Sequence, residues 1–142
     1  LHVILLYRLE RAMLAGDMRP DDLPAAWNEG VVRLFGLTPT SDREGCLQDI
    51  HWFDGAWGYF PTYTLGALTA AQMFAAARRG IPGLEREIAR GQFAPLTAWL
   101  RDHVHARASS VGAEAIIVEA TGNPLGAADF LAHLRRRYLS EI

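Results

Sequence analysis

The chain has 142 residues, half of them hydrophobic, and carries a formal net charge of −2 with 14 arginines and no lysine. This near-neutral balance lacks the basic face that nucleic-acid binding usually requires, and no apolar stretch approaches the roughly 20 residues that cross a bilayer. The single Cys46 cannot form an internal disulfide, so we expect a packed, unreactive thiol and a reducing, cytoplasmic compartment.

The first predicted element is a helix over residues 1–16, which is apolar through most of its first two turns and ends near Gly16. It opens without an initiator methionine or a polar N-cap, and its first half has no clear polar face. We therefore expect the chain to be the C-terminal fragment of a longer protein. In that case absent helices would normally cover five apolar side chains, namely Leu1, Val3, Ile4, Leu5 and Leu6.

A second helix is predicted to start at a cap formed by Asp21 or Asp22 and to end at Gly36. Residues 37–45 form a connection rich in turn-forming side chains. A short helix over residues 43–53 is also predicted, and it would place Gln48 and His51 on one face because they are three residues apart. Residues 54–58 then form a turn that contains two glycines.

The rest of the chain carries helical periodicity. We predict a long helix from about Pro61 to Arg79, followed by shorter helices over residues 83–90, 94–107, 112–120 and 126–140. No segment alternates apolar and polar residues over the length of a strand. The sequence therefore predicts an all-α fold of six to eight helices, organised as one domain over residues 1–142.

Polar side chains of several kinds are concentrated around the start of the long helix: Gln48, Asp49, His51, Trp52, Tyr59 and Tyr63. A histidine can donate a hydrogen bond to a substrate carbonyl or carboxylate, and a neighbouring aspartate can fix its tautomer. A tyrosine hydroxyl can stabilise an oxyanion. The alternative is that these residues make ordinary hydrogen bonds in a helical core, and composition alone favours that interpretation.

Two motifs contain this cluster: Gly45-x-x-Gln48-Asp49-x-His51-Trp52 and Gly58-Tyr59-Phe60-Pro61-Thr62-Tyr63. Together they resemble the carboxypeptidase Taq family of zinc metallocarboxypeptidases. The similarity continues along the chain in blocks such as residues 9–12, 22–29, 88–96 and 121–125. Leu6 and Arg8 depart from it, because the family pattern has an arginine and an acid at these positions.

The resemblance implies the C-terminal helical portion of a larger, mostly helical metallopeptidase that removes C-terminal amino acids from peptides. It implies functional roles for the clustered residues: catalytic for Tyr63, His51 and Tyr59, and substrate-binding for Gln48, Asp49 and Trp52. The alternative function is that of a non-catalytic helical domain for interaction or scaffolding.

The metal of such an enzyme is held by His-Glu-x-x-His and a downstream glutamate, and this sequence contains no His-Glu-x-x-His. His103 and His105 do not replace it, since residues two apart on a helix point to different faces. We therefore expect no metal ligand in the chain, no activity of the chain alone, and zinc or a similar divalent metal in the full-length enzyme. The expected partners are the peptide substrate, the missing N-terminal part and, in a homo-oligomer, a second copy.

Overall fold

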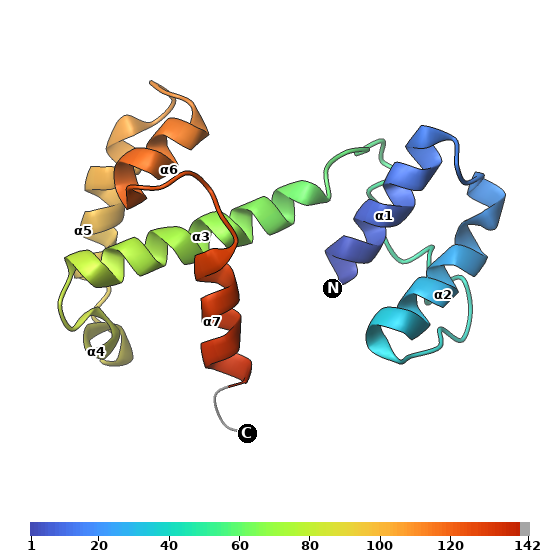
Figure 1. Cartoon of the computed structure of the whole chain (residues 1–142), viewed down its shortest axis with the longest axis horizontal. Coiled ribbons are helices and arrows are strands. Elements are labelled where there is room, and N and C mark those ends of the chain that lie inside the picture. The colour runs from blue at the N-terminus through green and yellow to red at the C-terminus, as the bar shows by residue number, and fades with distance from the viewer. Residues whose placement is uncertain (140–142) are drawn as a thin grey trace. The chain divides into compact units, whose positions relative to one another are not determined.

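The computed structural model describes residues 1–139, which form seven α-helices and two short 3₁₀ helices without a strand (Figure 1). This result confirms the predicted all-α fold of six to eight helices. Residue 140, at the end of the last predicted helix, lies outside the described residues. The α-helices are α1 His2–Ala15, α2 Leu23–Phe35, α3 Pro61–Gly80, α4 Leu84–Ala89, α5 Ala94–His103, α6 Ala113–Thr121 and α7 Ala128–Tyr138. The 3₁₀ helices are η1 Pro20–Asp22 and η2 His105–Arg107.

The chain divides into two compact units, Leu1–Thr64 and Leu65–Ile142. The first contains α1, α2 and the first turn of α3, and the second contains the rest of α3 with α4 to α7. The single domain expected from the sequence stays a prediction. Within the described residues, none of the helices is long and apolar enough to cross a membrane.

The ends of the first two helices follow the predicted signals. Gly16 and Gly36 both adopt the left-handed conformation, with φ of 79° and 67°, at the C-caps of α1 and α2. Only glycine adopts this conformation at little cost, which is why each helix stops there. Asp22 is the N-cap residue of α2, but its carboxylate accepts the backbone N–H of Arg19 at 3.2 Å and makes no cap bond to α2.

The core of the first unit forms where α1 packs against α2 (Figure 1). Its members are seven buried side chains: Leu5, Leu6, Leu9, Trp27, Cys46, Trp52 and Phe60. The expectation that Leu5 and Leu6 are uncovered is wrong, because they are only 2% and 1% exposed. The cause is that α2 and residues 45–60 cover this face of α1 within the unit. Leu1 and Ile4 remain exposed as expected.

The helix predicted over residues 43–53 does not form, and residues 41–58 follow a series of turns instead. The Asp49 carboxylate accepts the backbone N–H of His51 at 2.9 Å, two residues on. Such a bond gives the amide a partner other than a helical carbonyl and so competes with helix formation. Gln48 therefore shares no helical face with His51, and its side-chain amide donates to the carbonyl of Arg43 at 2.6 Å.

The second unit is held together around the buried side chain of Gln72 in the middle of α3. Its Nε2 lies 2.9 Å from Thr121 Oγ1 and 3.0 and 3.1 Å from the carbonyl oxygens of Asn123 and Pro124. Its Oε1 accepts the backbone N–H of Gly126 at 3.0 Å. The side chain of Gln72 thus connects α3 to the turn that comes after α6.

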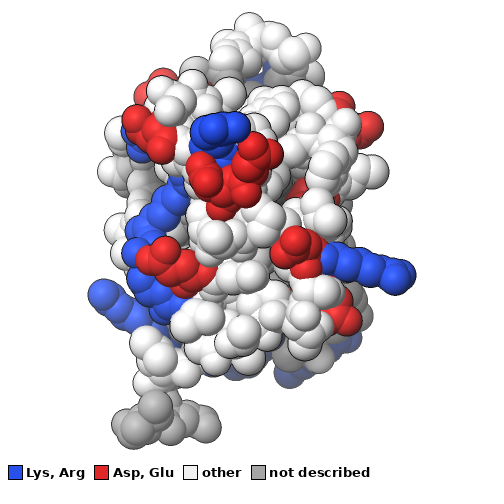
Figure 2. Space-filling model, turned by 90° about the vertical axis from the view of Figure 1, so that its right-hand side faces the viewer, with Lys and Arg blue, Asp and Glu red and all other residues white. Residues whose placement is uncertain are grey.

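Charged side chains are dispersed over the face drawn in Figure 2. Acidic and basic groups lie interspersed among neutral ones, and neither sign covers that face. This distribution agrees with the formal net charge of −2.

Candidate functional site

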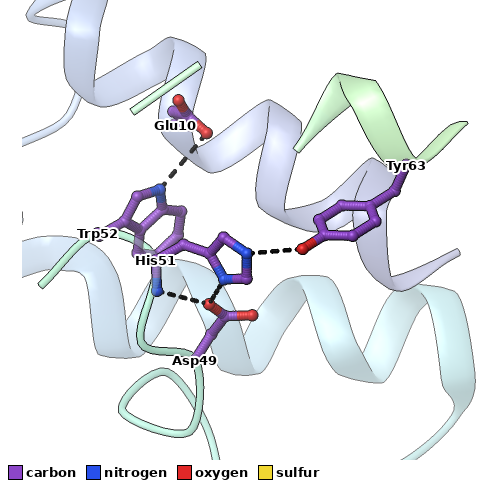
Figure 3. A network of polar contacts seen from close by, with 5 residues as sticks. All are labelled: Glu10, Asp49, His51, Trp52 and Tyr63. Carbon is purple, nitrogen blue, oxygen red and sulfur yellow. Dashed lines mark hydrogen bonds and ion pairs between the residues drawn. The ribbon is translucent and has the colours of Figure 1, made fainter. Parts of the chain in front are cut away.

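His51 lies at the centre of a hydrogen-bonded chain in the first unit (Figure 3). Its ring Nδ1 is 2.5 Å from Oδ1 of Asp49, and the same oxygen accepts its backbone N–H at 2.9 Å. On the other side of the ring, Nε2 is 2.9 Å from the hydroxyl oxygen of Tyr63. Asp49, His51 and Tyr63 are therefore linked in series through both nitrogens of one imidazole.

The carboxylate of Asp49 is held in its charged form. Burial is the largest single effect and raises its pKa, because desolvation penalises the charge. The two hydrogen bonds from His51, with the charges of His51 and His2, act in the opposite direction and together outweigh burial. The net result is a lowered pKa, so Asp49 is an ionised acceptor at neutral pH.

Three aromatic rings fix the position of the imidazole. Phe60 is 1% exposed and lies 4.9 Å from His51 between ring centroids, so it forms the base of the site. Tyr59 stacks on His51 at 5.7 Å, and Tyr63 meets it edge-on at 5.8 Å. The two tyrosine rings also contact each other in a T-shaped arrangement at 5.4 Å. Both tyrosines are 48% exposed, whereas Phe60 is buried beneath His51. The two tyrosines are therefore the accessible part of the site.

The start of α3 brings Tyr63 to the histidine. Pro61 occupies the first position of the helix, where the absent N–H has no helical partner to lose. The backbone N–H of Tyr63 donates to the carbonyl of Phe60 at 3.3 Å, so the buried ring and the first turn of α3 are adjacent. The position of Tyr63 therefore depends on how Phe60 is anchored in the core.

Two of the residues expected at the site make no contact with the ring of His51 that the structure records. Trp52 is buried in the core, with its indole N–H directed at the carboxylate of Glu10 rather than at His51 (Figure 3). Gln48 is exposed and bonded to the backbone of Arg43. The structure thus brings together four of the six expected residues: Asp49, His51, Tyr59 and Tyr63.

Glu10 is a contributor that sequence reasoning missed. It is 2% exposed, and its carboxylate accepts the indole N–H of Trp52 at 3.4 Å and the backbone N–H of Gly58. It thereby holds both ends of the segment that follows His51. Glu10 follows Leu6 by four residues, so the two lie on the same face of α1, and this spacing could have indicated that Glu10 is buried.

The described part of the chain does not fit a metal centre. Among residues 1–139 no group of three or more His, Cys, Asp or Glu side chains is arranged to hold an ion. His103 is instead bonded through Nδ1 to the carbonyl of Trp99 at 2.9 Å and stacks on its ring. We assign no metal ligand to these residues.

Comparison with known proteins gives a consistent set of relatives. The sequence model described as carboxypeptidase Taq (M32) metallopeptidase matches residues 1–138. Thermostable carboxypeptidase 1 of Thermus thermophilus and its namesake from Pyrococcus furiosus are 41% and 38% identical over 138 residues. These alignments cover 97% of this chain but only 27% and 28% of the relatives. The chain thus spans little more than a quarter of the length of either relative.

Solved structures agree with these sequence relatives. The M32 carboxypeptidase from Deinococcus radiodurans R1 superimposes with a TM-score of 0.92 at 41% identity, over 96% of this chain and 28% of that one. Trypanosoma cruzi metallocarboxypeptidase 1 gives a TM-score of 0.92 at 36% identity, over 96% of this chain and 29% of its own. The helical arrangement described above therefore recurs inside much longer proteins.

Proposed function

Because the chain belongs to the carboxypeptidase Taq (M32) metallopeptidase family, we propose that it is the substrate-binding segment of a metal-dependent carboxypeptidase. The full-length enzyme would hydrolyse C-terminal amino acids from peptides. The observation that carries the proposal is the chain of hydrogen bonds from Asp49 through His51 to Tyr63 beside a half-exposed Tyr59.

The chemistry of this group suits the binding of a peptide carbonyl. Hydrolysis of an amide places negative charge on the carbonyl oxygen in the transition state, and preorganised donors stabilise that charge. Removing one such donor typically costs about 3 kcal/mol of transition-state stabilisation. The rings of His51 and the two tyrosines hold one another in place, so a hydroxyl donor carried by this group is preorganised.

The family implies a divalent metal in the full-length enzyme, and we propose zinc or a similar ion. The described residues do not fit such a site, so its ligands would lie in the part of the enzyme that this chain does not cover. For the same reason we propose that the 142-residue chain is inactive alone and that its partners are the remaining enzyme and a peptide substrate.

The proposal is tested in the full-length protein that contains this segment. Hydrolysis of acylated dipeptides should be measured for the wild type, with and without a metal chelator, and for His51→Ala. We expect chelator-sensitive hydrolysis of the C-terminal peptide bond. Turnover should fall by roughly a hundredfold in the variant, because Tyr59 loses the ring on which it stacks and Tyr63 loses its hydrogen-bond partner.

His103→Ala is the matched control, because His103 is an exposed histidine bonded to the backbone of its own helix. It should leave turnover unchanged. A full-length protein that releases no C-terminal amino acid, or a His51→Ala variant with wild-type turnover, would refute the proposal.

A further inference from the structure

We infer that the two tyrosines of the site have different roles: Tyr63 is a positioning residue whose hydroxyl is committed to His51, and Tyr59 presents the hydroxyl that meets the substrate. The inference rests on the proposed function for the identity of the substrate.

The hydrogen-bond partners of His51 determine its tautomer. An ionised carboxylate only accepts, so the ring nitrogen 2.5 Å from Asp49 is the one that carries the hydrogen. In a neutral imidazole the other nitrogen then has a free lone pair. In the neutral state of His51, Nε2 is therefore an acceptor.

The hydroxyl of Tyr63 must be the donor in the second bond. It lies 2.9 Å from Nε2, and a hydroxyl has a single hydrogen to donate. Once that hydrogen points at His51, the oxygen of Tyr63 offers only lone pairs to other groups. An oxyanion needs donors, so in this state Tyr63 cannot stabilise it.

Tyr59 differs from Tyr63 in this respect. Its ring is held by stacking on His51 at 5.7 Å and by edge contact with Tyr63 at 5.4 Å. Across residues 1–139 its hydroxyl has no hydrogen-bond partner, and the residue is 48% exposed. A fixed ring with an unused donor is what recognition of a carbonyl oxygen requires.

The hydrogen bonds can be read directly in the 142-residue chain by nitrogen NMR of the His51 side chain. At about pH 8 we expect a protonated Nδ1 and an unprotonated Nε2. Tyr63→Phe should shift the Nε2 resonance, because it removes the donor. Tyr59→Phe preserves the stacked ring and should leave both nitrogens unchanged.

A protonated Nε2 in the wild type at that pH would overturn the inference, because Tyr63 would then accept and keep its own hydrogen free. An equal shift of Nε2 in both variants would overturn it as well.

The full-length enzyme tests the substrate-facing role. We expect Tyr59→Phe to lower kcat/KM by roughly a hundredfold. Tyr63→Phe should cause a smaller loss, because it leaves the donor of Tyr59 in place. The reverse order would overturn the assignment. A wild-type enzyme without peptidase activity would contradict the proposed function alone, since the NMR measurement needs no catalysis.

Discussion

The carboxylate of Glu10 accepts a hydrogen bond from the indole N–H of Trp52, the residue next to His51, with 3.4 Å between Oε2 and Nε1. The acid is almost fully buried, and a buried charge is costly unless polar groups satisfy it. The backbone N–H of Gly58 supplies a second donor to the same carboxylate. The bond thus connects α1 to the segment that carries the site.

Replacing Glu10 should destabilise the first unit. Glu10→Ala leaves the buried indole N–H of Trp52 and the partly buried N–H of Gly58 without an acceptor, and we expect a loss of about 2–4 kcal/mol in the free energy of unfolding. Glu10→Gln retains one carbonyl oxygen and should cost less. Urea denaturation followed by tryptophan fluorescence measures both. Glu29→Gln, at an exposed position on α2, is the control and should change little; similar losses for Glu10→Ala and this control would contradict the prediction.

Gln72 should be equally sensitive in the second unit. Gln72→Leu keeps a similar volume but leaves the N–H of Gly126 without its acceptor and the carbonyl of Pro124 without the donor of Gln72. We expect a loss of about 2–3 kcal/mol, because two partly buried polar groups lose their partner and each such loss costs about 1–3 kcal/mol. Thermal unfolding measures it. Gln92→Leu changes an exposed glutamine in the same way and should be almost neutral; an unchanged melting temperature in Gln72→Leu would show that these bonds contribute no net stability.

Replacing Gly30 even by alanine should lower the free energy of unfolding. A Cβ at this position would lie 2.3 Å from Cδ1 of Leu5, which is buried and has little freedom to move. Alanine gains about 1 kcal/mol of helix propensity, but the overlap should outweigh it and give a net loss of about 1–3 kcal/mol. Gly66→Ala in α3 is the matched control, since nothing lies within 4 Å of its added Cβ, and it should stabilise the protein. Chemical denaturation of both variants decides, and a stabilised Gly30→Ala would contradict the predicted overlap.

The stability of the first unit should depend on pH through Asp49. Its pKa is lowered in the folded state, so its contribution is present above the unfolded value of about 3.9 and is lost as pH falls through the folded value. Unfolding measured between neutral and strongly acidic pH should show a smaller acid-dependent loss in Asp49→Asn than in the wild type. Asp17→Asn, at an exposed position, should retain the wild-type slope. Parallel pH profiles for the wild type and Asp49→Asn would refute the proposed linkage.

Much of the fold was predictable because its boundaries have strong local signals. Gly16 and Gly36 end helices where left-handed backbone is needed, and Pro61 begins one where its missing N–H costs nothing. The helix expected over residues 43–53 does not form, because the backbone N–H of His51 donates to the carboxylate of Asp49 instead of to a helical carbonyl. Hydrophobic periodicity carries no information about such a bond, so the prediction was wrong.

The site was predictable to the extent that its members are close in sequence. Asp49 and His51 are two residues apart, so their contact could be anticipated. The contact between His51 and Tyr63 spans twelve residues and depends on the path of the turns between them, which sequence patterns do not specify. Glu10 lies further still from Trp52, and its charge argued against the burial that the structure shows.

The sole thiol of the sequence has a practical use that follows from its surroundings. Cys46 is 1% exposed, and burial together with the nearby Asp42 raises its pKa, so the reactive thiolate is scarce in the closed protein. A thiol reagent can then modify it only when its segment opens, and Cys46 lies three residues before Asp49. The rate at which the reagent modifies Cys46 therefore reports how often the polypeptide around His51 opens locally.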